Sequence, residues 1–434
     1  MQYHFPISPA AYQIVAMLQE AGFESYIVGG AIRDLLLQRK PKDFDISTAA
    51  TPEEVRALFG RRKARIIGKR FRLTHVTMGR ELFEVSTFRK TPSEHAGDSS
   101  QEKFQKMPEN LIVSDNSYGN SREDAFRRDF TVNALFYDPV KDELIDHTGM
   151  GLQDIENRTV RAIGDPALRF EEDPVRMLRA LKLVAQFDFS LESSTENALF
   201  NALPLLEHAS AGRLSLELEK ILKSSSSDRH FEVFFDYGLL NCFIPFLAEN
   251  WGTPQCKRAI DLLYERNCRV DAEIYRDSIS LALAAMMFPF VTGETGGGTT
   301  PQWLERTPEN DEMFHRFAVE MFSPLTLIVK VREAAMRIIQ MQKMLEEASN
   351  DAIAQLMRYK SYAHARELLM IRHLANGEDV STLEARFPKG NDPRDFHHLA
   401  SYPRQNQSPN RKKSGRKHYR RRKKRPETPP DFTE

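Results

Sequence analysis

Two aspartates near the N-terminus, Asp43 and Asp45, have the spacing of a metal-binding pair. The residues around the second one, 44–46, have the apolar character of a short strand. Because side chains at positions i and i+2 of a strand point to the same face, we expect the two carboxylates to lie side by side. Mg²⁺ binds proteins through one or two carboxylates and takes water or substrate phosphate as its other ligands. The pair therefore predicts a magnesium site, although an isolated Asp-x-Asp is more often a solvated strand edge.

Two adjacent glycines, Gly29 and Gly30, precede these aspartates and follow the short apolar segment 26–28. Glycine lets the backbone approach a bulky anion closely, and the N-terminus of the helix expected after it favours negative charge. By itself a glycine pair usually marks only a turn. Together with the two aspartates it predicts a phosphate site next to a metal site, which is the layout of a nucleotidyl-transfer site.

The order of these residues resembles a known family signature. Gly29 and Gly30, followed by Arg33 and Asp34 and then by the aspartate pair, are similar to the head-domain signature of the polymerase-β-like nucleotidyltransferases. The likeness is greatest to the class II branch, which contains bacterial poly(A) polymerases and CCA-adding tRNA nucleotidyltransferases. It implies an α+β head domain of the nucleotidyltransferase fold, with a mixed sheet and helices, followed by an all-α neck and body.

The resemblance to bacterial poly(A) polymerases also implies an activity. The protein would be a polynucleotide adenylyltransferase that transfers AMP from ATP to RNA 3′ ends, of mRNA or other RNA, without a template and with release of pyrophosphate. Two Mg²⁺ ions would be held by Asp43 and Asp45 as catalytic residues, and Gly29, Gly30 and Arg33 would position the triphosphate. CCA addition to tRNA from CTP and ATP is the alternative, and an inactive RNA-binding relative is a third hypothesis.

A cluster of cations follows the second aspartate at Lys69, Arg70 and Arg72. These side chains suit a triphosphate or an RNA backbone, and a solvated turn is the alternative. The segment 66–73 resembles the one that bacterial poly(A) polymerases carry at this place, where CCA-adding enzymes usually differ. The resemblance therefore assigns Lys69 and Arg70 to nucleotide binding and favours polyadenylation.

One carboxylate, Glu84, lies within the apolar, β-branched segment 82–88. A charge in such a segment is unfavourable unless it is paired or binds a ligand. The resemblance suggests a third catalytic acid, either as a metal ligand or as a base for the attacking hydroxyl. The alternative is a salt bridge at the rim of the strand, for which Arg89 is a candidate.

Three consecutive charged residues, Arg127, Arg128 and Asp129, form the next motif. Two arginines can hold phosphate in forked hydrogen bonds, and an aspartate can accept from a ribose hydroxyl. Such a string is common on surfaces, but this one resembles the Arg-Arg-Asp motif of class II enzymes. The resemblance implies nucleotide binding and a preference for ribose over deoxyribose.

A further motif contains Glu172, Asp173 and Arg176, with Arg179 one turn later. Asp173 is expected to cap a helix whose first residue is Pro174, so a capped helix with an ion pair explains the pattern structurally. The segment also resembles the Glu-Asp-x-x-Arg motif with which class II enzymes read the incoming base. An acid beside an arginine can offer an acceptor and donors to a base edge, so the resemblance assigns these four residues to nucleotide binding.

The elements that must position these residues change in kind along the chain. Strands are expected at 26–28, 44–46, 64–67, 74–78 and 82–87, with helices at 9–21 and from Thr51 onward. After residue 163 no convincing strand is expected, and helical patterns cover 172–187, 213–222, 231–246, 313–347 and 358–374. We expect a catalytic head over 1–150, a helical neck that binds base and RNA over 151–250, a helical RNA-binding body over 251–402 and a disordered tail over 403–434.

Composition restricts the class of protein. The chain has 434 residues, enough for two to four domains, and 41% of them are hydrophobic. No apolar run reaches the length of a membrane span and the N-terminus lacks the order of a signal peptide, so a cytoplasmic location is expected. The three cysteines, Cys242, Cys256 and Cys268, show no Cys-x-x-Cys pair and indicate free thiols.

The net charge of zero hides a strong asymmetry. Residues 411–425, from Arg411 to Arg425, contain eleven Lys or Arg and no acid, whereas residues 1–410 contain 50 basic and 58 acidic residues. A block of like charge repels itself and stays extended. The basic tail is therefore a predicted contact for the RNA backbone, with a solvated tail that has no specific partner as the alternative.

Overall fold

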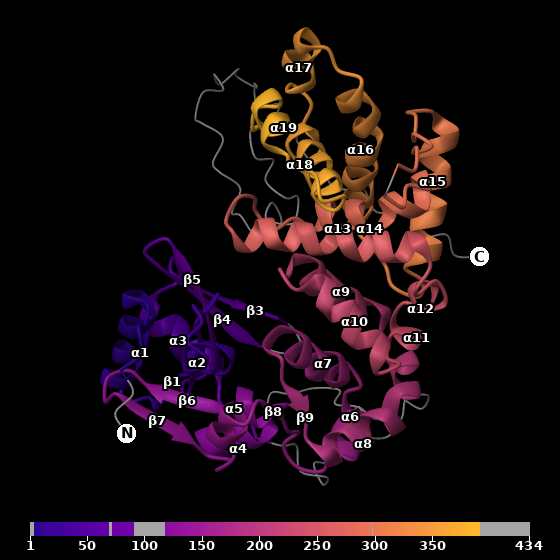
Figure 1. The fold of residues 1–434 in the computed structure, drawn as a ribbon. Coiled ribbons are helices and arrows are strands. Elements are labelled where there is room, and N and C mark those ends of the chain that lie inside the picture. Colours follow the sequence, from indigo (N-terminus) through magenta and orange to yellow (C-terminus); the bar gives the residue numbers. More distant parts are fainter. Residues whose placement is uncertain (1–3, 69–71, 91–117, 297, 391–434) are drawn as a thin grey trace, which may run out of the picture. The chain divides into compact units, whose positions relative to one another are not determined.

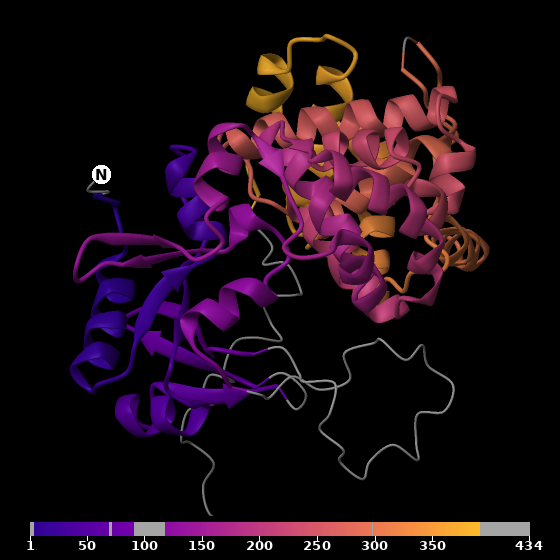
Figure 2. The ribbon, with the colours of Figure 1, turned by 90° about the horizontal axis from the view of Figure 1, so that it is seen from below.

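A seven-stranded mixed sheet forms the N-terminal head. The computed structural model describes residues 4–68, 72–90, 118–296 and 298–390. The strand order is β3-β4-β5-β2-β1-β6-β7, and β2–β5 is the parallel pair. In Figures 1 and 2 the sheet lies in the indigo and purple part of the chain, whereas the pink, orange and yellow part consists almost entirely of helices. The elements of the head are α1 (Pro9–Glu20), β1 (Ser25–Val28), α2 (Gly30–Leu36), β2 (Asp45–Thr48), α3 (Pro52–Phe59), β3 (Ala64–Ile67), β4 (Leu73–Met78), β5 (Glu81–Thr87), α4 (Ser121–Arg127), η2 (Thr131–Asn133), β6 (Leu135–Asp138) and β7 (Glu143–Asp146).

Alternation along the strands divides the head into two apolar layers. On β1, Ile27 joins the large core with α1, α2 and α3, whereas its neighbour Val28 packs on the other side with Phe88, Ala125 and Phe136. Successive strand residues point to opposite faces, so each strand supplies both layers. The sheet is thus fixed from both sides where the predicted site residues begin.

Local sequence explains how the helices of the head start. Thr51 caps α3 in a capping box with Glu54, and Pro52 occupies the first helical position, as the sequence predicts. Gly29 precedes α2 with φ +75° and ψ −134°, a conformation that is essentially restricted to glycine. The glycine turn therefore forces the chain from β1 directly into α2.

The neck is mostly helical but contains a small second sheet. Its elements are α5 (Gly151–Glu156), β8 (Thr159–Val160), α6 (Pro166–Glu172), α7 (Val175–Phe187), β9 (Ser190–Leu191), α8 (Ser193–Ala202), η3 (Leu203–His208), α9 (Ala211–Lys223), α10 (Ser227–Asp236), α11 (Leu240–Phe243) and α12 (Pro245–Glu249). The prediction of no strand after residue 163 is wrong, because β9 pairs with β8 in parallel. The predicted helix over 172–187 is also broken, since Asp173 and Pro174 separate α6 from α7.

The body is built around α14, which is buried almost all round. Its elements are α13 (Pro254–Asp271), α14 (Ile279–Thr292), α15 (Pro308–Met321), α16 (Val329–Glu346), α17 (Asn350–Leu356), α18 (Tyr362–Leu374) and α19 (Ser381–Arg386). Helices α13, α16 and α18 pack against α14 (Figure 1). The continuous helix predicted over 313–347 is wrong, because 322–328 separates α15 from α16. None of the described helices is both long and apolar enough to span a bilayer.

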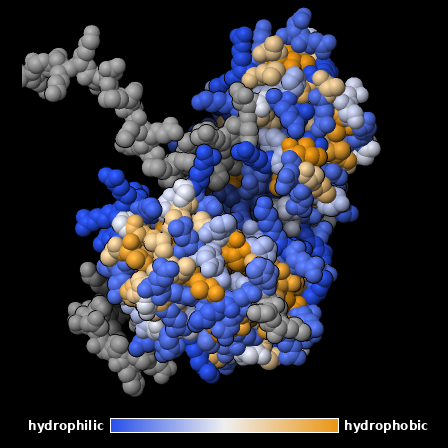
Figure 3. Space-filling view, turned by 90° about the vertical axis from the view of Figure 1, so that its left-hand side faces the viewer, coloured by the Kyte–Doolittle hydropathy of each residue, from blue (hydrophilic) through white to orange (hydrophobic). Residues whose placement is uncertain are grey.

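The observed architecture confirms the predicted fold class: a mixed sheet with helices, then a helical remainder. On the face seen in Figure 3, hydrophobic residues form small separate patches among hydrophilic ones. The three cysteines are free thiols, as predicted. The domain boundaries at 150, 250 and 402 stay predictions, and the basic tail lies outside the described residues.

Candidate active site

The two aspartates lie at the start of β2. Asp45 is the first residue of the strand and Asp43 lies just before it, so the prediction that both belong to the strand is wrong for Asp43. Asp45 is the position opposite Val28 in the register with β1. Both aspartates are exposed, and within the described part of the chain neither forms an ion pair. Two free carboxylates thus face solvent at the end of a buried strand.

The third predicted acid, Glu84, lies beside them. Ile46 pairs with Val85 in the parallel register of β2 and β5, which makes Asp45 and Glu84 neighbouring positions on the same face. Glu84 is exposed, and its Oε1 lies 3.5 Å from Nε2 of His75 on β4. Although Asp45 keeps contact with water, desolvation by the surrounding protein, then repulsion from Asp43 and from Glu84, raise its pKa to about 6. The three carboxylates therefore concentrate negative charge in one place.

The glycine turn borders the Arg-Arg-Asp motif. A Cβ added to Gly29 would lie 3.1 Å from Nη1 of Arg128, so only glycine leaves room for this guanidinium. Arg128 donates to Asp124 (3.0 Å), to the Asn133 carbonyl (3.3 Å) and to Ser47 Oγ (3.2 Å) on strand β2. The motif arginine is thereby attached to β2 itself, two residues beyond Asp45.

Hydrogen bonds within the protein hold the side chain of Arg33, which was predicted to bind triphosphate. Its guanidinium binds the neighbouring Asp34 through two nitrogens (3.0 and 2.6 Å) and Oδ1 of Asn133 (2.6 Å), and it lies over the Phe187 ring at 4.4 Å. Gly30 lies directly beside it. Arg33 thus connects the glycine turn to Asn133, and Asn133 in turn donates to Asp129 (3.1 Å).

Asp129 belongs to a chain of charges that crosses from head to neck. Arg179 contacts Asp129 (3.2 Å) and donates to Asp173 (3.2 Å), which also accepts from Arg213 (2.8 Å). Burial acts to raise the pKa of Asp129, but Arg179 and hydrogen bonds from Asn133 and from the Phe130 amide outweigh it, so this pKa lies below its usual range. Asp129 therefore stays an anion able to accept hydrogen bonds.

The second motif contains an acid–arginine pair, but its acid is Glu172 and not the expected Asp173. Glu172 accepts from Arg176 (2.9 Å), on the first turn of α7. The helix begins at Val175 with Pro174 as its N-cap, so the predicted cap at Asp173 is wrong. The Asp173 carboxylate still accepts from the Val175 amide at 3.2 Å. The structure thus brings Glu172 and Arg176 together, while Asp173 faces Arg179 and Arg213.

Comparisons with known proteins agree with this geometry. The family model of the poly A polymerase head domain matches residues 25–161, and a model described as the probable RNA and SrmB-binding site of polymerase A matches residues 188–250. The chain is 41% identical over 249 residues to poly(A) polymerase I of Haemophilus influenzae.

Over its head and neck the chain is similar to poly(A) polymerases and CCA-adding enzymes. It is 35% identical over 290 residues to poly(A) polymerase I of Escherichia coli O157:H7 and 39% identical over 223 residues to the CCA-adding enzyme of Bacillus pumilus. These matches cover 66% and 51% of this chain. The chain spans 54% of the length of the Haemophilus relative and 61% of the Escherichia one.

Solved structures of this family share the fold. The crystal structure of the Bacillus stearothermophilus CCA-adding enzyme in complex with CTP matches with a TM-score of 0.57 and 25% identity, over 92% of this chain and 89% of that one. The Thermotoga maritima CCA-adding enzyme in complex with tRNA matches with a TM-score of 0.50 and 20% identity, over 85% and 79%. The likeness therefore extends past the head into the helical region.

The residues present fit the magnesium ions that the family implies. The described residues hold no group of three His, Cys, Asp or Glu side chains arranged to bind a metal by themselves. Mg²⁺ requires only one or two carboxylates, with water and substrate phosphate completing its shell. Asp43 and Asp45, which are exposed and have no ion-pair partner in the described ranges, meet that requirement. Lys69 and Arg70, predicted to bind the nucleotide, lie outside the described residues.

Two residues that form these contacts were not predicted as site residues from the sequence. Arg169 donates to Glu172 (2.8 Å) and Arg213 donates to Asp173. The spacing of Arg169 and Glu172 at i and i+3 could have indicated their contact, because such positions share a face of one helix. No sequence pattern indicated the contact of Arg213, because its partner Asp173 lies forty positions away.

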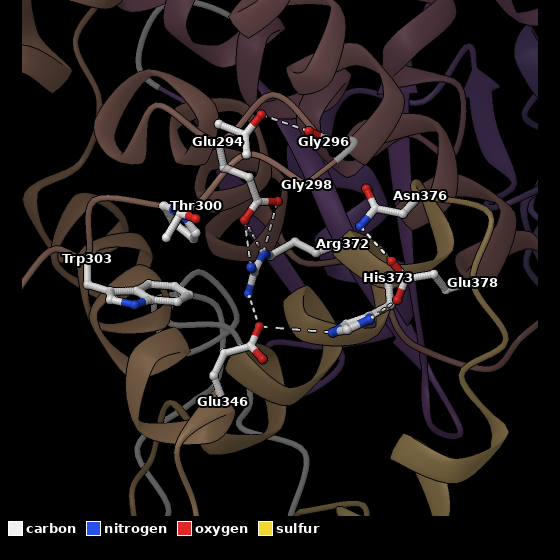
Figure 4. A pocket seen from close by; sticks show the side chains of 12 residues that line it. Glu294, Gly296, Gly298, Thr300, Trp303, Glu346, Arg372, His373, Asn376 and Glu378 are labelled. Carbon is white, nitrogen blue, oxygen red and sulfur yellow. Dashed lines mark hydrogen bonds and ion pairs between the residues drawn. The ribbon is translucent and has the colours of Figure 1, made fainter.

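A cavity of about 330 Å³ lies apart from this site, in the body (Figure 4). Arg372 lies at its centre and binds Glu294 through Nη2 at 2.6 Å and Glu346 at 3.0 Å. Its guanidinium also lies 5.4 Å from the Trp303 ring. Arg372 therefore forms ion pairs with two of the acids that line the cavity.

Proposed function

We propose that this protein is an RNA nucleotidyltransferase that adds AMP from ATP to RNA 3′ ends without a nucleic-acid template. The observation that carries the proposal is the exposed pair Asp43 and Asp45, joined by Glu84 and next to a glycine turn. Unpaired acids at one spot are costly unless a cation compensates them. The arginine-rich surroundings supply the groups that a nucleotide needs.

In the proposed reaction the RNA 3′-oxygen attacks the α-phosphorus of ATP. The new ester bond forms as the bond from the α-phosphorus to the bridging oxygen breaks, and pyrophosphate leaves with that electron pair. Asp43 and Asp45 would hold two Mg²⁺ ions, which would favour ionisation of the attacking hydroxyl and stabilise charge on the leaving group. Glu84, beside Asp45, serves as a further ligand or as the base that takes the hydroxyl proton.

Nucleotide binding is proposed for the arginines around the catalytic strand. Arg127 and Arg128 would hold the phosphates, next to the turn formed by Gly29 and Gly30. Lys69 and Arg70 are proposed from the sequence as further phosphate-binding residues. Asp129, held ionised, would accept from the ribose hydroxyl.

Base choice is proposed for the motif at the start of α7. Glu172 and Arg176 form one hydrogen-bonded pair, and Asp173 with Arg179 forms a second. An acid held against an arginine offers acceptors and donors to a base edge. The protein itself would then select the nucleotide.

CCA addition to tRNA is the second candidate, because both a 39% identical relative and a similar solved structure are CCA-adding enzymes. The two functions are separated by offering ATP or CTP to a generic RNA and to tRNA that lacks its 3′ CCA. Long A-tails on any RNA support polyadenylation. Addition that stops after C, C and A on tRNA supports the alternative, and no incorporation with Mg²⁺ would revive the inactive relative.

The basic tail is proposed to contact the RNA backbone. Residues 411–425 carry eleven cations, whereas the first 410 residues are acidic overall. Ending the chain before Arg411 should weaken RNA binding and reduce its salt dependence, because fewer counterions are released. Equal RNA affinity of both chains at low salt would remove the tail from the proposal. The cytoplasmic location that the sequence predicts is part of this proposal.

A further inference from the structure

Arg169, on α6, connects two motifs that the proposed function uses separately. Its Nη2 donates to the carbonyl of Arg127 (2.6 Å) and to the carbonyl of Arg128 (2.7 Å). Its Nη1 donates to Glu172 Oε2 at 2.8 Å. The side chain is 12% exposed, so these bonds form with little competition from water. One guanidinium thus joins the backbone of the head to an acid of the neck.

On the head side, Arg169 binds where helix α4 ends. Arg127 is the last residue of α4 and Arg128 is its C-cap. The final carbonyls of a helix have no partner within the helix, and a cation there is favourable. Because Arg128 also donates to Ser47 on β2, this helix end is fixed relative to the catalytic strand.

On the neck side, Arg169 holds both members of the base-reading pair. Its side chain binds Glu172, and its own carbonyl accepts from Arg176 Nη1 at 2.7 Å. The same Nη1 of Arg176 donates to Glu172 at 2.9 Å. Both groups that would face the base are therefore oriented through Arg169.

We infer that Arg169 is a positioning residue that sets nucleotide selectivity. It aligns Glu172 and Arg176 with the Arg128–Asp129 segment, so that a nucleotide held by its phosphates and ribose presents its base edge at the correct place. This inference rests on the proposed function, because it deepens the role of the same site. A base reader displaced by a fraction of an ångström loses its hydrogen bonds while the phosphate contacts stay intact.

The geometry requires arginine at this position. A guanidinium is planar and presents several donors in a rigid fork, whereas an ammonium is a single point charge. Lysine at position 169 could reach the carbonyls or the carboxylate, but not both in the same arrangement. The variant Arg169→Lys therefore separates the fork geometry from the positive charge.

The test compares equilibrium binding of ATP, UTP and inorganic tripolyphosphate, with Mg²⁺ and without RNA, to the full chain and its variants. The variants are Arg169→Lys, Arg169→Met and the control Arg337→Met. Arg337 binds Gln340 and Asp311 on the body and is also partly buried. Thermal unfolding of each variant accompanies the binding measurements.

We expect both Arg169 variants to lower the ratio of ATP to UTP affinity about tenfold. Tripolyphosphate affinity should stay within about twofold of the unaltered protein, and Arg337→Met should change neither quantity. Such a result cannot come from loss of structure, which would weaken all three ligands together.

Three results would overturn the inference: a parallel loss of all three ligands, an unchanged ATP to UTP ratio in both variants, or an unaltered protein that does not distinguish ATP from UTP. A separate assay on the unaltered protein follows extension of a generic RNA and of tRNA lacking CCA. Selective binding without any extension would refute the proposed function, while the binding ratios of the variants still decide the role of Arg169.

Discussion

Arginine clusters hold together both the head–neck site and the body, but they differ in what they leave exposed. In the body, Arg258 and Arg372 converge on Glu294, and all three side chains are at most 7% exposed.

At the head–neck site, hydrogen bonds from protein groups hold Arg128, Arg169 and Arg176. Asp43 and Asp45, in contrast, stay exposed without an ion pair among the described residues.

The difference separates a scaffold from a reactive site. A buried ion pair is tolerated only when its partners compensate each other, and breaking it leaves a desolvated charge. The body cluster meets this condition, so its arginines fix α13, α14 and α18 in place. The head–neck site keeps like charges together at an opening, which a structural cluster would avoid. Its surplus acidic charge indicates a cationic ligand.

The largest effect on activity is expected from Asp43→Ala. The variant should lower the rate of nucleotide incorporation at least about a thousandfold, equivalent to about 4 kcal/mol of transition-state stabilisation, because a metal ligand is lost. Its unfolding temperature should match that of the unaltered protein, since Asp43 is exposed. Asp261→Ala, at an exposed position of α13, is the control. Full activity of the Asp43 variant would refute the metal assignment.

The largest effect on stability is expected from Glu294→Ala. Removing this carboxylate leaves Arg258 and Arg372 buried without it, which should lower the free energy of unfolding by about 3–5 kcal/mol. Denaturant titration measures the change. The control is Glu305→Ala, which removes an exposed ion pair with Lys343 and should leave stability almost unchanged. Equal effects of the two variants would mean that the body cluster is no more structural than a surface pair.

A smaller effect is expected at the glycine turn. Gly29→Ala should cost about 1–3 kcal/mol, because the conformation at φ +75° is strained for any residue with a Cβ. The added Cβ would also press on Arg128 and weaken ATP binding. Gly212→Ala, in α9 with no atom within 4 Å of the added Cβ, should be neutral or slightly stabilising. Destabilisation of both variants to the same extent would contradict the special role of Gly29.

The most gradual effect is a loss of stability in mild acid. Burial lowers the pKa of His230 and that of His364 to about 4 each, below the usual 6.5. Between these values the unfolded chain binds more protons than the folded one, so the free energy of unfolding falls as pH drops from 6.5 towards 4. Each histidine contributes at most about 1.4 kcal/mol per pH unit.

Both histidines belong to the neck and body. The raised pKa of Asp45 acts in the opposite direction, because the folded chain binds that proton more readily than the unfolded one. The comparison of the unaltered protein with His230→Gln therefore isolates the histidine: urea unfolding between pH 7 and pH 4.5 should show a smaller loss of stability in the variant. An equal loss in both proteins would contradict the prediction.

The spacing of apolar residues predicted several strands of the head close to their observed positions. Strand β3 lies at the predicted residues, and β1, β4 and β5 differ by one residue at their starts, because alternation of apolar residues is a local property. Strands β6 and β7 were missed, because neither segment shows the alternation of apolar and polar residues that indicates a strand. Asp43 was expected within β2, but pairing with β1 begins only at Asp45.

The sequence by itself determined which residues could do chemistry: the aspartate pair, the glycine turn, the Arg-Arg-Asp motif and the acid–arginine motif are each contained within a few positions. Only the tertiary structure decided how they are joined. Asn133 bridges Arg33 to Asp129, and Arg169 connects α4 to α7 across about forty residues. Such contacts depend on sheet register and helix packing, and these are set by burial of the whole core and not by any short segment.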